Sequence, residues 1–128
     1  DEFKACEISS VEEIADLFSV PFYFGCEADD RLNAVAFDKR LNHFDVELRA
    51  MFGSDIGHWD VPDMTKCVPD AYQMVENGLI SADNFRDFML TNPAEFFMRK
   101  NPEFFKGTVL EGYKIWEFHP KFSVNSSA

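Results

Sequence analysis

The stretch LRAMFGSD, residues 48–55, decides how the rest of the chain is interpreted. It is a short apolar segment that ends in Gly53, which allows a tight turn, and then a carboxylate at Asp55. The stretch FYFGCEADD, residues 22–30, has the same order of apolar and acidic residues. Each apolar segment has the length and composition of a strand buried on both faces. The repeat predicts a parallel α/β sheet with an acidic loop after each strand.

Helical patterns precede and separate the two predicted strands. In SSVEEIADLF, residues 9–18, Ser10 is the expected N-cap, Glu13 reaches back to it, and Pro21 ends the helix. Residues 31–41 have apolar side chains at helical offsets and predict a second helix.

Further helices are predicted after the second strand. Residues 64–79 predict a helix that Pro69 could interrupt and that Asn77 and Gly78 cap, and Ser81 is the expected N-cap of the next. The stretches NPAEFF at residues 92–97 and NPEFF at 101–105 predict two more helix starts. The β-like residues 107–120 are candidates for a third short strand.

Composition limits the class of protein. The 128 residues suit a single folded region, and 46% apolar and 16% aromatic residues exclude an intrinsically disordered chain. A net charge of -11 without a basic cluster argues against nucleic acid. No apolar run is long enough for a bilayer, and the three Cys form no CxxC pair. We therefore expect no membrane partner and a cytoplasmic protein with reduced thiols.

Asp55 and His58 are the candidate catalytic residues. Asp55 follows the second strand, where parallel α/β folds place their chemistry, although a cap on the next helix explains the same residue equally well. His58 could reach the same cavity or be an ordinary surface residue. Glu27, Asp29 and Asp30 follow the first strand in the equivalent place and could bind a divalent cation or be solvated loop charges.

Four stretches together resemble a known family: FYFGCEADD, RAMFGSDIGHWDVPDM, GLISADNFRDFMLTNPAEFF and NPEFFKGT. They resemble the C-terminal part of a metal-dependent amidohydrolase-superfamily protein, in the branch with the carboxymuconate-semialdehyde decarboxylases, over about residues 8–111. The resemblance implies the C-terminal portion of a (β/α)8 TIM-type barrel, helix-rich with two or three short parallel strands. Strand seven would span about 22–27, strand eight about 48–54, and the closing helices 64–106, all in one region, 1–128.

The resemblance also implies chemistry. The family's last barrel strand ends in an Asp that binds or faces a divalent metal and its water, and Asp55 matches it as metal ligand and catalytic residue; zinc is the expected metal. His58 and Trp59 would line the mouth of the pocket. The family's HxH pair and mid-barrel His have no counterpart here. A barrel needs about 250 residues, so the chain would be its last third to half and inactive alone.

The sequence is therefore consistent with two candidate functions. The first is part of a metal-dependent hydrolase or decarboxylase in which a metal-activated water attacks a small-molecule substrate. The alternative is a small acidic, non-catalytic module whose Phe-rich surface binds a protein. The unpaired edges of so small a sheet predict either self-association or dependence on the missing portion of the barrel.

Overall fold

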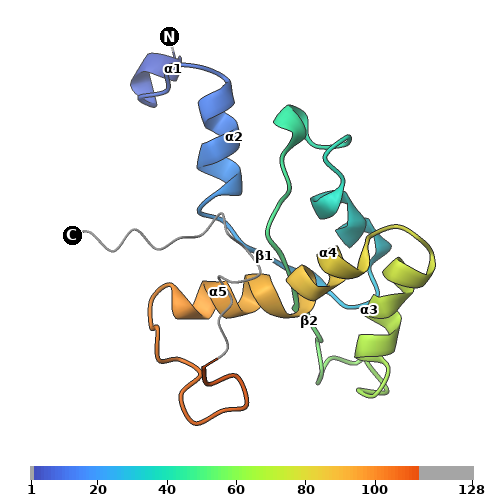
Figure 1. The fold of residues 1–128 in the computed structure, drawn as a ribbon. Helices are drawn as coiled ribbons and strands as arrows, with labels where there is room; N and C mark the ends of the chain where they lie inside the picture. Colours follow the sequence, from blue (N-terminus) through green and yellow to red (C-terminus); the bar gives the residue numbers. More distant parts are fainter. Residues whose placement is uncertain (1, 113–128) are drawn as a thin grey trace.

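The computed structural model describes residues 2–112 and shows a small mixed α/β architecture (Figure 1). Strands β1 (Phe24–Glu27) and β2 (Ala50–Gly53) pair in parallel, with Phe24 opposite Ala50 and Glu27 opposite Gly53. The predicted parallel pairing is confirmed, although each strand is shorter than expected. No third strand occurs within residues 2–112, and most of the third-strand candidate lies outside this range.

One rod of helix lies against the sheet. It consists of α4 (Ala82–Arg86), the π-helical turn η3 (Asp87–Thr91) and α5 (Asn92–Met98), of which η3 and α5 contact β2 (Figure 1). Ser81 caps it as predicted, because the Asn84 amide donates to the Ser81 hydroxyl at 3.0 Å and the Asn84 side chain accepts from the Ser81 amide at 3.2 Å.

The prediction of a separate helix start at residues 92–97 is wrong, since Thr91 is already helical. Pro93 explains the wider turn that precedes it. A proline has no amide hydrogen and its ring clashes with the carbonyl four residues earlier, which here belongs to Met89 in η3. The helix therefore widens and continues. The second expected start is also wrong, because residues 102–107 form turns.

Phe88 in η3 is the centre of the core. It has no exposed surface and makes edge-to-face contacts with Phe37 and Phe52, at centroid distances of 6.2 and 6.0 Å. Helix α3 (Cys67–Glu76) adds Ala71 and Met74 to the same cluster.

Helix α3 begins at Cys67, later than the predicted start at Met64, and ends with the predicted cap. Pro69 lies in its first turn, where amides have no helical partner, so it does not interrupt the helix. Asn77 caps the other end and Gly78 has a φ of 69°, as expected for a residue just past a helix.

The prediction that strand 22–27 is buried on both faces is wrong, because Gly25 and Glu27 are exposed. The predicted helix at 31–41 is the shorter 3-10 helix η1 (Arg31–Phe37), which the Asp30 side chain caps by accepting from the Leu32 amide at 2.8 Å. A further 3-10 turn, η2 (His43–Asp45), follows it.

The N-terminal helices α1 (Glu2–Ala5) and α2 (Glu12–Ser19) extend away from the sheet and have no buried residue (Figure 1). Ser10 is not the N-cap, since α2 begins after Val11 without a side-chain cap. Glu13 instead accepts from the Ser9 amide at 2.9 Å. The helix ends before Pro21, as predicted.

A polar and aromatic cluster joins the amino ends of the strands to α5. Arg49 donates to the Tyr23 hydroxyl at 2.8 Å and lies 3.5 Å from the Glu95 carboxylate. Burial, and then the nearby Glu95 charge, raise the pKa of Tyr23, so its hydroxyl stays protonated at neutral pH. Within the described part of the chain, no helix combines the length and apolarity needed to cross a bilayer.

Candidate functional site

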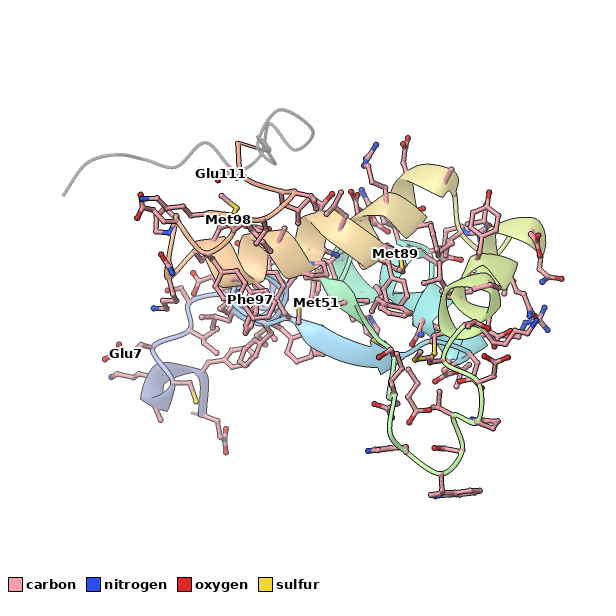
Figure 2. All side chains as sticks on the ribbon, turned by 90° about the horizontal axis from the view of Figure 1, so that it is seen from below. Glu7, Met51, Met89, Phe97, Met98 and Glu111 are labelled. Atoms are coloured by element: carbon pink, nitrogen blue, oxygen red, sulfur yellow. The ribbon has the colours of Figure 1, made fainter. Side chains whose placement is uncertain are left out.

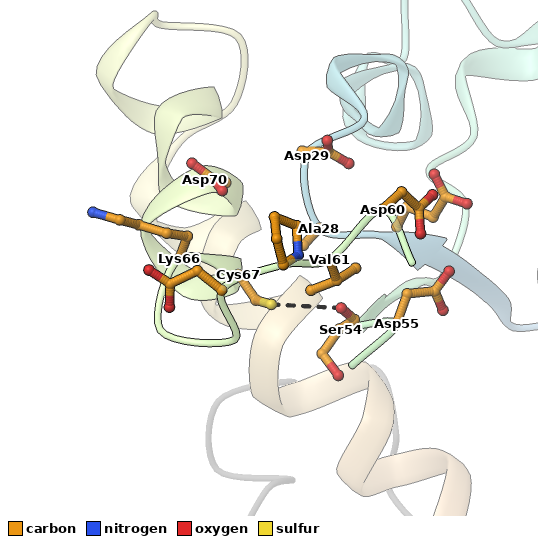
Figure 3. Close-up of a pocket in the computed structure, with 12 residues that line it drawn as sticks. Ala28, Asp29, Ser54, Asp55, Asp60, Val61, Lys66, Cys67 and Asp70 are labelled. Carbon is orange, nitrogen blue, oxygen red and sulfur yellow. Dashed lines mark hydrogen bonds between the residues drawn. The ribbon is translucent and has the colours of Figure 1, made fainter. Parts of the chain in front are cut away.

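A hollow of about 240 Å³ lies at the carboxyl ends of the two strands (Figure 3). The loops after β1 and β2 and the start of α3 form its walls. Six of its lining side chains are carboxylates and one, Lys66, is basic. The acidic residues are Glu27, Asp29, Asp55, Asp60, Asp63 and Asp70.

Asp55 lies in this hollow in an unusual backbone conformation. Its φ of 50° is in the left-handed region, which few residues other than Gly adopt. The tight turn predicted at Gly53 therefore occurs at Asp55 and at Gly57, which has a φ of 106°. Gly53 serves a different purpose, since a Cβ there would lie 3.0 Å from the carbonyl oxygen of Cys26 on the neighbouring strand.

The explanation of Asp55 as a cap on the next helix is wrong. Helix α3 begins at Cys67 with Lys66 in the N-cap position, far along the chain from Asp55. The Asp55 carboxylate instead lies 3.3 Å from Nδ1 of His58, and its side chain is 38% exposed. Asp55 thus keeps an accessible carboxylate at the edge of the hollow.

His58 and Trp59 lie outside the lining of the hollow. The His58 side chain is 66% exposed, and Trp59 is 94% exposed. The sequence predicted both at the mouth of the pocket. The structure brings His58 to the site only through its contact with Asp55.

The other acidic residues separate into two groups. Glu27 and Asp29 line the same hollow as Asp55 at the sheet edge, as the sequence predicted. Asp30 does not, because its side chain caps η1. Asp63 accepts from the Thr65 hydroxyl at 2.6 Å and from the Thr65 amide at 2.9 Å. These two bonds lower the pKa of Asp63, whose carboxylate caps the turn at Thr65.

The start of α3 contributes residues that sequence reasoning missed: Lys66, Cys67 and Asp70. The Cys67 thiol donates to the Ser54 carbonyl oxygen at 3.5 Å and so ties α3 to the end of β2 (Figure 3). A general rule of parallel α/β folds could have predicted these three residues. A helix that follows a parallel strand begins near the carboxyl end of that strand, so its first turn faces the strand-end loops.

Within residues 2–112, no three His, Cys, Asp or Glu side chains are grouped so that they could hold a metal ion. Asp55 therefore offers one carboxylate, with His58 beside it, rather than a complete ligand set. Comparison with protein-family models, curated proteins and solved structures finds no match to this chain.

Proposed function

We propose that this chain is the C-terminal portion of a (β/α)8 barrel in a metal-dependent hydrolase or decarboxylase. Asp55 would be the acidic residue at the end of the last barrel strand. The position of Asp55 is the observation that supports it. Asp55 follows β2 at the carboxyl end of a parallel pair, does not cap a helix, and has a left-handed backbone. Sparsely populated conformations at non-Gly residues are concentrated at functional sites.

The proposal requires ligands from outside residues 2–112, because the described residues do not form a metal site. A divalent metal, with zinc the expected one, would supply an activated water for attack on a carbonyl carbon. Asp55 would contribute one carboxylate oxygen and accept a proton. His58, 3.3 Å from that carboxylate, would orient it.

The charge of the hollow favours one of the two reactions. Decarboxylation requires a carboxylate substrate, and six acidic side chains against Lys66 alone repel an anion. A neutral or cationic substrate meets no such barrier. Hydrolysis of an uncharged or cationic small molecule is therefore the better fit.

The test compares the Asp55→Asn and Asp63→Asn variants. Both are made in the protein that is expressed from the complete coding sequence containing this chain. Asn tolerates the left-handed backbone of position 55, so the variant should keep its fold. We expect Asp55→Asn to lower turnover by about a hundredfold or more, the scale of losing a positioned acid–base group. Asp63→Asn should leave turnover nearly unchanged, because the Asp63 carboxylate is occupied by Thr65.

Metal content and melting temperature are measured for both variants, since lost metal or lost fold also lowers the rate. Near-normal turnover of metal-loaded Asp55→Asn would refute the assignment. The coding sequence itself provides a second test, because the proposal expects an HxH after an apolar strand upstream of this chain.

A small acidic binding module is the second candidate, and Trp59 is the observation that favours it. Its side chain is 94% exposed at the loop beyond the hollow, and Trp is enriched among residues that dominate protein interfaces. The isolated chain distinguishes the two. A compact monomer that melts cooperatively favours the module, whereas self-association or a broad transition favours part of a larger barrel.

A further inference from the structure

Glu27 has a position in the sheet that separates it from the other acidic residues of the hollow. It ends β1 and lies opposite Gly53 of β2 in the parallel register. Side chains alternate between the two faces of a strand, so the register pair Cys26 and Phe52 marks one face and the next pair the other. Cys26 and Phe52 pack against the core, and Phe52 contacts the helical rod. Glu27 therefore lies on the sheet face that the rod does not cover.

The positions next to Glu27 on that face carry no side chain. They are Gly25, two residues earlier in β1, and Gly53 on β2. A Cβ built at Gly25 meets no atom within 4 Å, so the face is open at that point. Glycines inside strands often mark a place where a ligand approaches the backbone closely. The two glycines therefore leave room for a ligand beside the Glu27 carboxylate.

The backbone of Glu27 is held in place, whereas its carboxylate is available. Nδ2 of the buried Asn33 donates to the Glu27 carbonyl oxygen at 2.6 Å. The Glu27 side chain is exposed, and no residue within 2–112 forms a hydrogen bond or an ion pair with its carboxylate. Asp29 and Asp60 also line the hollow, but they lie in loops beyond the strands. Glu27 is thus the acidic residue of the hollow that a strand fixes and that keeps its carboxylate free.

We propose that Glu27 binds an ammonium group of the substrate that occupies the hollow. This inference rests on the proposed function, because it names a group of the substrate on which Asp55 would act. An ammonium group carries three hydrogen-bond donors for a carboxylate, and the charge of the hollow, six acidic residues against Lys66, attracts a cation. Glu27 would therefore determine which substrate binds, while Asp55 acts at the reacting carbonyl.

The test measures the binding of two probes of the same shape to the metal-loaded protein that is expressed from the complete coding sequence. Glycine anilide carries an α-ammonium group, which is largely protonated at about pH 6.5, and propionanilide has a methyl group in its place. Calorimetry should show that the parent binds glycine anilide at least about tenfold more tightly, the scale of a hydrogen bond between charged groups. Glu27→Gln should reduce that preference to about twofold or less, because the amide keeps the shape but loses the charge. Asp63→Asn removes a charge from the same hollow and is the matched control, which should keep the preference.

Three results would each overturn the proposal: equal affinity of the parent for both probes, an unchanged preference in Glu27→Gln, or an equal loss in Asp63→Asn. The third would assign the preference to the general charge of the hollow. Glu27 is exposed, so Glu27→Gln should keep the melting temperature of the parent, and Glu27→Ser is the second variant.

Binding of the probes requires no turnover, so this test and that of the proposed function can fail separately. If Asp55→Asn lowers turnover while Glu27→Gln keeps the preference, the Glu27 assignment alone is wrong. If metal-loaded Asp55→Asn keeps its turnover, the proposed function is wrong whatever Glu27→Gln shows.

Discussion

Replacing Phe88 by Ala is expected to remove much of the stability of this protein. Phe88 has no exposed surface and contacts both Phe37 from η1 and Phe52 from β2. Truncation of a buried Phe to Ala typically costs about 3–5 kcal/mol, and the two edge-to-face pairs place this site in the upper part of that range. Domains of this size have only about 5–15 kcal/mol in total. Urea unfolding followed by circular dichroism measures the loss.

Leu32→Ala is the matched control, because Leu32 is a large apolar residue with 74% of its surface exposed. Its free energy of unfolding should change by less than about 0.5 kcal/mol. If Phe88→Ala unfolded within about 1 kcal/mol of the parent, Phe88 would not be the residue that joins the helical rod to the sheet.

Three further predictions concern the sheet and its surroundings. Asn92→Ala should cost about 1–3 kcal/mol in urea unfolding, because the buried Asn92 amide donates to a β2 carbonyl at 2.9 Å; an unchanged midpoint would contradict this. Gly53→Ala should destabilise by about 1–3 kcal/mol, since the added Cβ meets a β1 carbonyl, whereas Gly25→Ala meets nothing and should not. The Arg40 guanidinium holds the pKa of Asp38 at about 2, below its ordinary 3.8, so this ion pair stabilises the fold above pH 4 and is lost as the pH falls toward 2. Carboxyl titration by NMR should show that shift. Arg40→Met should reduce it but not abolish it, because the backbone amide of residue 40 still donates to the Asp38 carboxylate.

The sequence predicted the parallel pairing and the acidic strand ends for a physical reason. The two apolar runs are short, are followed by carboxylates and are separated by a helical pattern, and few arrangements other than a parallel pair satisfy all three. The caps at Ser81 and Asn77 were also predictable, because capping depends on residues close together in the chain.

The errors came from contacts that a local pattern does not contain. Pro93 indicated a new helix, yet the η3 turn adapts to it and the rod continues. Phe88 within that turn and Asn92 just after it both contact β2, and these contacts hold the rod against the sheet. The turn at Asp55 was placed at Gly53, since Gly is the usual residue there. The actual requirement at Gly53 is space beside the neighbouring strand, which only the paired structure reveals.

The buried core uses little of the aromatic content of the chain. The chain has fifteen Phe, but among the described residues Phe88 and Met74 are the large side chains that are fully buried, and five of the nine buried apolar residues are Ala. An Ala removes little apolar area from water, so this core stabilises the fold less than the composition suggests. Several other rings, such as Phe18 at 49% and Phe22 at 53%, keep about half of their surface exposed, so that part of their apolar area still contacts water. A ligand or partner that binds only the folded chain, at these rings or at the acidic hollow, should therefore raise its free energy of unfolding.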